Sequence, residues 1–101
     1  MLISASDDKT VKLWALPSQR FVATLAGHLN WVRAADFSPD CRLAASGGDD
    51  KTLRVWDVAS RRQLRLYDDH AGMVGSVAWH PDGTCVASAG SDNTIKVWDI
   101  R

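Results

Sequence analysis

A long internal repeat constrains this chain more than any other feature of its sequence. Three segments align without gaps, and each ends in a tryptophan that lies 42 residues from the next one. The positions that recur with this spacing are residues 4–14, 46–56 and 88–98, His28 and His70, and Pro39 and Pro81. Repeats of roughly 20 to 50 residues are typical of folds in which one small structural unit stacks on its neighbours.

Along the aligned segments the residues follow a period of two that is typical of β-strands, as in the run from Val11 to Trp14. The Pro-Asp pairs that begin at Pro39 and Pro81 are turn signals, and no long segment has helical periodicity. We therefore expect an all-β, antiparallel chain. The expected strands are 2–5, 10–15 and 20–25, then 31–37, 42–47, 52–57 and 62–67, then 73–79, 84–89 and 94–100. They make an incomplete unit over 1–25, a complete unit over 31–67 and an incomplete unit over 73–101.

The period, together with a Gly-His pair at Gly27 and a Trp-Asp pair at Trp56, resembles the WD40 repeat family. The resemblance covers the whole chain. It implies a β-propeller in which each repeat builds a four-stranded blade. We therefore expect a propeller fragment of about two and a half blades. Because propellers close with about four to eight blades, we expect the remaining blades of a longer chain, or further copies, to complete the ring.

Two repeats carry Ser, His, Asp and Trp at fixed offsets and the first carries Ser, Asp and Trp, a pattern that could suggest a serine hydrolase. The WD40 resemblance implies a structural tetrad instead, in which the Trp indole binds the hydroxyl, the hydroxyl the imidazole, and the imidazole the carboxylate. A buried indole N–H needs an acceptor, whereas a nucleophile needs one exposed serine beside an oxyanion site. We therefore predict a protein that is not an enzyme. The expected tetrads are His28, Ser46, Asp50 and Trp56, then His70, Ser88, Asp92 and Trp98, then Ser4, Asp8 and Trp14.

Composition excludes several other functions. Twelve basic and twelve acidic residues cancel, so we expect neither a nucleic-acid footprint nor a membrane patch. No His, Cys and carboxylate spacing matches a zinc site and no phosphate loop occurs, so we expect no metal and no cofactor. Cys41 and Cys85 have no disulfide pattern, and the N-terminal residues lack a signal-peptide pattern. These features indicate a soluble intracellular protein with reduced thiols.

Three positions depart from strict repetition. Gly27 corresponds to Asp69, and Gly83 of the second Pro-Asp turn corresponds to Cys41. If the latter position is left-handed, cysteine costs about 1 kcal/mol relative to glycine. Trp79 aligns with Phe37, and we expect it in the core.

The resemblance also implies where a partner protein would bind, because WD40 proteins commonly use the rim where inter-blade loops and turns meet. Trp31 is the leading candidate, since its counterpart is Met73 and packing does not require an indole there. Trp and Arg are favoured at binding hot spots. The alternative is that Trp31 only covers the blade junction. The candidate partner-binding residues are Trp31, Arg33 and Asp49, with Met73 and Gly75 as the counterparts of the first two, and Ser91 and Asp7 on the other turns.

Five segments are similar in sequence to the middle blades of the "proteome of centriole" protein 1 family. These segments are residues 6–15, 28–33, 37–40, 80–85 and 92–99. The resemblance implies a seven-bladed propeller in the cytoplasm and cytoskeleton, at centrioles, basal bodies or cilia. Its partners would be centriolar or microtubule-associated proteins, and it would support centriole and cilium integrity.

A second interpretation comes from the segment Val86 to Arg101, which ends in Trp98-Asp99-Ile100-Arg101. It is similar to the box by which some WD40 proteins dock on the adaptor of a cullin-RING ubiquitin ligase. Under this alternative the protein is a substrate receptor.

Overall fold

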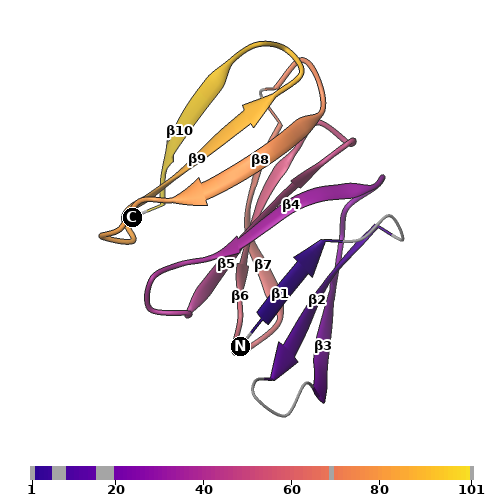
Figure 1. Cartoon of the computed structure of the whole chain (residues 1–101), viewed down its shortest axis with the longest axis vertical. Helices are drawn as coiled ribbons and strands as arrows, with labels where there is room; N and C mark the ends of the chain where they lie inside the picture. Colours follow the sequence, from indigo (N-terminus) through magenta and orange to yellow (C-terminus); the bar gives the residue numbers. More distant parts are fainter. Residues whose placement is uncertain (1, 6–8, 16–19, 69, 101) are drawn as a thin grey trace.

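The computed structural model describes residues 2–5, 9–15, 20–68 and 70–100, and all of its regular elements in these ranges are β-strands. The strands form three antiparallel sheets (Figure 1). The first sheet contains β1 (Leu2–Ala5), β2 (Thr10–Ala15) and β3 (Arg20–Ala26). The second contains β4 (Val32–Phe37), β5 (Leu43–Gly48), β6 (Leu53–Asp57) and β7 (Arg62–Tyr67). The third contains β8 (Val74–Trp79), β9 (Cys85–Gly90) and β10 (Ile95–Asp99).

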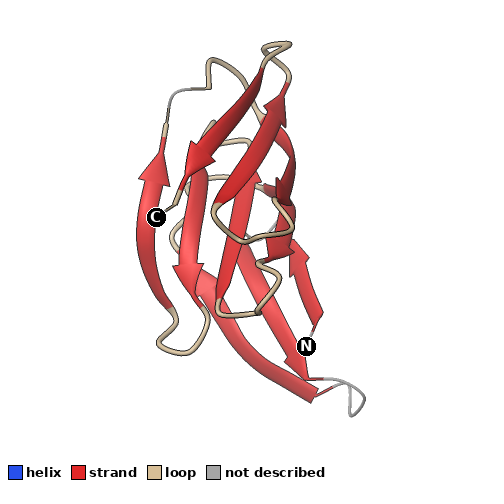
Figure 2. Ribbon diagram, turned by 90° about the vertical axis from the view of Figure 1, so that its left-hand side faces the viewer, coloured by secondary structure: helices blue, strands red, loops and turns tan. Residues whose placement is uncertain are grey.

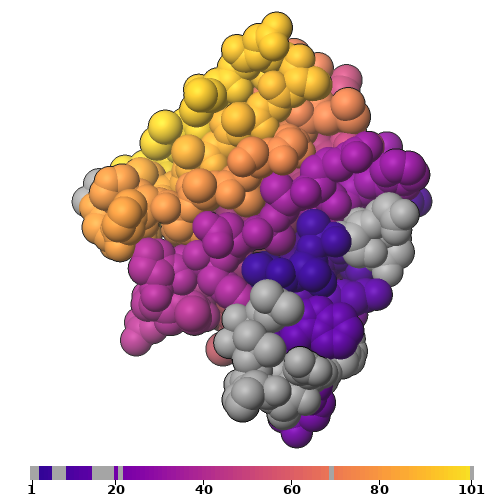
Figure 3. All heavy atoms as spheres, in the orientation of Figure 1, coloured from indigo at the N-terminus to yellow at the C-terminus, as the bar shows by residue number. Residues whose placement is uncertain are grey.

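Each sheet is a meander in which strands adjacent in sequence are paired. The orders are β1-β2-β3, β4-β5-β6-β7 and β8-β9-β10. Figure 2 shows the strands from the side, and Figure 3 shows the sheets as successive bands along the molecule. The prediction of an all-β antiparallel fold is therefore confirmed by the three sheets, and each observed strand starts and ends within one residue of its expected limits.

The 42-residue repeat extends to the irregularities of the backbone. A β-bulge interrupts the register at Leu13/Trp14 and again at Val55/Trp56, and a second kind of irregularity recurs at the start of β4 and of β8. The turn before β6 has a left-handed residue, Lys51, at φ 68°. Such recurrence means that each repeat specifies its own local backbone as well as its strands.

The turn between β4 and β5 contains the residue that departs from glycine. Cys41 has φ 60° and its amide donates to the Ser38 carbonyl, just as Gly83 has φ 75° and donates to the His80 carbonyl. The position is therefore left-handed in both repeats, and a cysteine there carries the backbone strain that a glycine avoids. Cys41 and Cys85 are both free thiols.

Two apolar clusters join the sheets. Between the first and second sheets lie buried residues of both, namely Val11, Leu13, Leu25, Val32, Ala44, Trp56 and Val58. Between the second and third sheets lie Ala45, Leu53 and Val86, with Tyr67, Trp79, Trp98 and Ile100 packed against them. Trp79 is partly buried in this second cluster, as expected, and its indole donates to the Asp36 carbonyl of β4 at 3.1 Å.

The outer face of the third sheet differs from the same face in the other two. Val11 and Leu13 in β2, and their counterparts Leu53 and Val55 in β6, are fully buried. The matching residues of β10, Ile95 and Val97, are 77% and 68% exposed. The first and second sheets thus each bury this face under the sheet that follows. The third sheet presents the same face to solvent.

Candidate functional site

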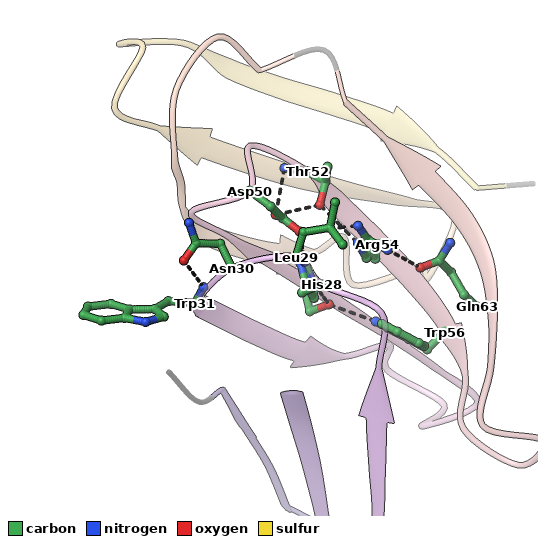
Figure 4. Close-up of polar contacts among 10 residues, drawn as sticks. His28, Leu29, Asn30, Trp31, Asp50, Thr52, Arg54, Trp56 and Gln63 are labelled. Atoms are coloured by element: carbon green, nitrogen blue, oxygen red, sulfur yellow. Dashed lines mark hydrogen bonds and ion pairs between the residues drawn. The ribbon is translucent and has the colours of Figure 1, made fainter. Parts of the chain in front are cut away.

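Four polar side chains meet inside the second sheet (Figure 4). The indole of Trp56 on β6 donates to the hydroxyl of Ser46 on β5 at 2.8 Å. That hydroxyl lies 2.7 Å from Nε2 of His28, which precedes β4. Nδ1 of His28 lies 2.9 Å from Oδ2 of Asp50, which sits in the turn between β5 and β6. The loop, two strands and a turn are therefore tied together by one chain of hydrogen bonds.

The chemistry of the four groups fixes where the protons lie. A carboxylate only accepts, so Nδ1 of His28 carries a hydrogen and donates to Asp50. Ser46 receives the Trp56 N–H and then donates its own hydrogen to Nε2 of a neutral His28. Burial lowers the pKa of His28, as does the nearby Arg54, and both outweigh the opposing effect of Asp50. The neutral form that the network needs is therefore also the form that burial favours.

Asp50 is the point where this network branches. Its carboxylate accepts hydrogen bonds from the Leu29 amide at 3.0 Å and from the Thr52 hydroxyl at 2.8 Å. Burial alone would raise the pKa of Asp50, but these hydrogen bonds and His28 together lower it. The buried guanidinium of Arg54 lies 3.4 Å from the same carboxylate and donates to Gln63 on β7 at 3.0 Å. The network thus reaches from the loop to the outer strand.

Sequence reasoning missed Arg54 and Gln63 as members of this network. The only signal for Arg54 was that a cation recurs at its position, as Lys12 and Lys96. Gly27 packs closely against the same network: a Cβ at this position would lie 2.9 Å from the Trp56 ring and 3.3 Å from Arg54. Asp69, the counterpart of Gly27, lies outside the described residues.

The third sheet repeats the tetrad. Trp98 donates to the Ser88 hydroxyl at 2.8 Å, Ser88 lies 2.7 Å from Nε2 of His70, and Nδ1 of His70 lies 3.0 Å from Asp92. Hydrogen bonds to the Asp92 carboxylate, the largest from Thr94, hold its pKa well below the usual range. In the first sheet Trp14 donates to Ser4 at 3.1 Å, while Asp8 lies outside the described residues.

Burial decides what these Ser-His-Asp sets can do. Ser46 is 0% exposed and Ser88 is 1% exposed, so neither hydroxyl can reach a substrate in solution. Each is also held by an indole N–H that a hydrolase nucleophile does not have. The arrangement satisfies buried polar groups, and in the described ranges no buried side-chain nitrogen or oxygen lacks a hydrogen-bond partner.

Within the described part of the chain, no group of three or more His, Cys, Asp or Glu side chains could hold a metal ion. The described residues also contain no helix long and apolar enough to cross a membrane.

A different group of side chains lies on the surface at the start of β4. We call Trp31, Arg33 and Asp49 the Trp31 surface. The indole of Trp31 is 46% exposed and points away from the tetrad (Figure 4). The Arg33 guanidinium lies over it, 5.2 Å from the ring centroid. Arg33 also donates to both carboxylate oxygens of Asp49, at 2.6 and 2.9 Å. This hydrogen bonding raises the pKa of Arg33 and lowers that of Asp49.

The backbone at Trp31 is held on both sides. Its amide donates to the Asn30 side chain at 2.8 Å, and its carbonyl accepts from the Asp49 amide at 2.8 Å. The neighbouring Leu29 is 77% exposed and adds apolar area that sequence reasoning missed. The Trp31 surface is therefore an exposed aromatic ring on a fixed backbone, with a clamped guanidinium above it.

The remaining candidates lie on the third sheet and on the first turn. Met73 is 43% exposed, and its amide donates to the hydroxyl of the exposed Ser91 at 3.0 Å. Gly75, the counterpart of Arg33, has no side chain, so the third sheet has no equivalent of the ion pair between Arg33 and Asp49. Asp7 lies outside the described residues.

Comparison with known proteins gives a consistent answer. The family model "WD domain, G-beta repeat" matches residues 1–15, 19–57 and 61–99. The chain is 47% identical over 47 residues to nuclear distribution protein PAC1 of Coccidioides posadasii, which is 46% of this chain and 10% of that protein. It is 53% identical over 38 residues to a lissencephaly-1 homolog of Dictyostelium discoideum, which is 38% of this chain and 9% of that protein.

The mouse WD repeat and SOCS box-containing protein 1 is 45% identical over 47 residues, which is 46% of this chain and 11% of that protein. The chain therefore matches only about a tenth of the length of these curated relatives.

Proposed function

Since this chain belongs to the WD40 repeat family, we infer that it is a non-catalytic scaffold that binds other proteins through the Trp31 surface. Protein-interaction scaffolding is the function of the family. The choice of surface is our own, and it rests on the exposed indole of Trp31 beneath the Arg33 guanidinium. Tryptophan and arginine are both enriched among the few residues that carry most binding energy at protein interfaces.

The side chains of this surface are already held in place, and this supports the proposal. Binding usually costs conformational freedom at the interface, and that cost falls when the side chains are already held in place. Here Asp49 clamps Arg33, and Asn30 and Asp49 fix the backbone of Trp31 on both sides. The alternative, that Trp31 only covers a blade junction, does not account for an indole that is 46% exposed. It also does not account for Trp31 lying outside both apolar clusters.

The finer part of the proposal is a structural role at centrioles and basal bodies, with microtubule-wall proteins as partners. It rests mainly on the resemblance of residues 28–33 and 80–85 to the centriolar family. Residues 28–33 include Trp31 and Arg33, so one of these two segments also carries two of the three residues of the Trp31 surface. One of the relatives is a nuclear distribution protein, and none of the relatives above is named as centriolar.

The ligase-receptor alternative depends on the segment from Val86 to Arg101. Much of that segment has a structural use, because Trp98 bonds to Ser88 and Ile100 packs in the second apolar cluster. No observation on this segment favours the alternative over an ordinary repeat.

The test is co-purification of the tagged protein from ciliated cells, with centriolar microtubule-wall proteins and a cullin-RING adaptor both quantified. Trp31→Ala should weaken the affinity for the partner roughly thirtyfold, the effect of losing about 2 kcal/mol at a hot spot, and should therefore lower the amount of partner recovered. Arg33→Ala should act in the same direction, and circular dichroism should show that both variants remain folded. Undiminished recovery with both folded variants would move the binding surface elsewhere, and recovery of the adaptor alone would favour the ligase role.

A further inference from the structure

The outer strand of the second sheet, β7, has no strand beside it on its outer side among the described residues. Figure 2 shows it at the left margin of the molecule. An edge strand presents a row of unpaired backbone N–H and C=O groups, which another extended segment can use to add a strand. This edge is separate in the chain from the Trp31 surface.

The side chains of β7 are unusually exposed. Five of its six residues are exposed, and only Tyr67 is partly buried, where it stacks on Trp98 with ring centroids 4.4 Å apart. Leu64 and Leu66 are 46% and 44% exposed. Arg65 lies opposite Val55 and Leu66 opposite Arg54, so β7 presents a cation on one face of the sheet and a leucine on the other.

This edge is also a local excess of positive charge on a chain whose net charge is zero. Three arginines lie within five residues, and none of them forms an ion pair with a described acidic residue. Arg61 donates to the Val58 and Ala59 carbonyls, and Arg65 donates to the Leu64 carbonyl. Their charges are therefore available to an outside partner, as is that of Arg62.

Comparison with the first sheet shows that the fold does not require these residues. β3 holds the same place in its sheet, and its residues precede those of β7 by 42 positions. Where β7 has Arg65 and Leu66, β3 has Ala23 and Thr24. A strand that only completed the sheet could use such small side chains, so the arginine and leucine of β7 have another use.

We propose that the β7 edge binds an extended segment of another protein in which acidic residues alternate with apolar ones. The partner adds as a strand, its backbone pairs with β7, its carboxylates face the arginines and its apolar side chains cover Leu64 and Leu66. A second copy of this chain is the wrong partner, because two β7 edges would bring arginines together. Charge complementarity thus selects an acidic segment.

The test uses a fluorescein-labelled peptide in which glutamate alternates with valine, and fluorescence anisotropy measures its binding to the purified protein. A control peptide carries lysine in place of glutamate. The acidic peptide should bind at least about tenfold more tightly. Two further versions carry N-methyl groups on alternate residues, along one edge or the other. Only the version with its methylated edge away from β7 should bind, because strand addition uses one edge of the peptide.

Variants locate the contact. Replacing Arg62→Glu together with Arg65→Glu should weaken the acidic peptide about tenfold and reverse the preference for charge. The milder pair Arg62→Gln and Arg65→Gln should act in the same direction and serves if the first pair fails to fold. Leu66→Thr installs the residue found in β3 and should also weaken binding. The matched control Arg20→Glu, at the position of Arg62 on β3, should leave binding unchanged.

The proposal is overturned if the acidic peptide binds no better than the lysine peptide, or if both N-methylated versions bind equally. It is also overturned if Arg20→Glu weakens binding as much as the β7 variants do. If the unliganded protein associates with itself and the β7 variants abolish that association, the partner is a second copy, and the assignment of an acidic partner is wrong.

Discussion

Removing the imidazole of His28 should destabilise the protein by about 2.5–4 kcal/mol. The side chain is fully buried, and His28→Ala removes two hydrogen bonds at once. The bond from the Ser46 hydroxyl joins two neutral groups and contributes about 1 kcal/mol, and the bond to the Asp50 carboxylate contributes about 1.5–3 kcal/mol. Asp50 keeps its bonds to Leu29 and Thr52, so the lower half of the range is expected.

The assay is urea denaturation followed by tryptophan fluorescence, with all proteins at one concentration because association shifts apparent stability. His80→Ala is the matched control, since the His80 side chain is 55% exposed and its loss should change stability by less than about 0.5 kcal/mol. A change below about 0.5 kcal/mol for His28→Ala would refute the structural account of the tetrad. A double-mutant cycle adds a second criterion: His28→Ala with Ser46→Ala should cost about 1 kcal/mol less than the sum of the single changes, because fewer buried groups are left unpaired.

Three other predictions follow from the same geometry. Stability should fall as the pH drops below about 6.5, because burial lowers the pKa of folded His28 while the unfolded histidine takes up a proton, and His28→Gln should flatten this slope in urea titrations. Cys41→Gly should raise the free energy of unfolding by about 0.5–1 kcal/mol and Gly83→Cys should lower it, with no difference between them counting against backbone strain. Residues 1–101 alone should associate as the concentration rises, because Ile95 and Val97 leave an apolar face exposed. Ile95→Lys with Val97→Lys should reduce this association in sedimentation experiments, and a wild-type protein that stays monomeric would contradict the role given to the exposed face.

The 42-residue period was enough to predict the strands, because the recurring tryptophans and Pro-Asp turns mark the same place in each unit. Val32 is buried and Trp31 exposed as expected, but strict alternation along β4 fails: the register shifts between Val32 and Ala34, and Ala35 and Phe37 pack in the same cluster as Val32. The contacts of Arg54 with Asp50 and Gln63 did not follow, since a cation on a strand is usually solvated, whereas Arg54 is buried close to Gly27. Periodicity shows which residue types recur, whereas those contacts depend on how the side chains pack within the unit.

The exposure of β7 was likewise hidden from the sequence. Leu64 and Leu66 fit an apolar strand pattern, and such residues are usually assigned to a core. The bulge at Val55/Trp56 and the place of β7 at the sheet edge leave them half exposed instead. Strand order and register decide this, and neither can be read from one repeat alone.

The central claim is that this chain is a scaffold that holds a partner at the Trp31 surface. The most direct measurement keeps Trp31 and places a photo-crosslinking amino acid at the neighbouring position 29, where the leucine is 77% exposed, and, in a separate protein, at position 80 in the exposed β8–β9 turn. The crosslinked products from ciliated cells are then identified by mass spectrometry. The account predicts that one partner protein is captured from position 29 and not from position 80. Capture of the co-purified partner from position 80 alone, or from neither position, would contradict it.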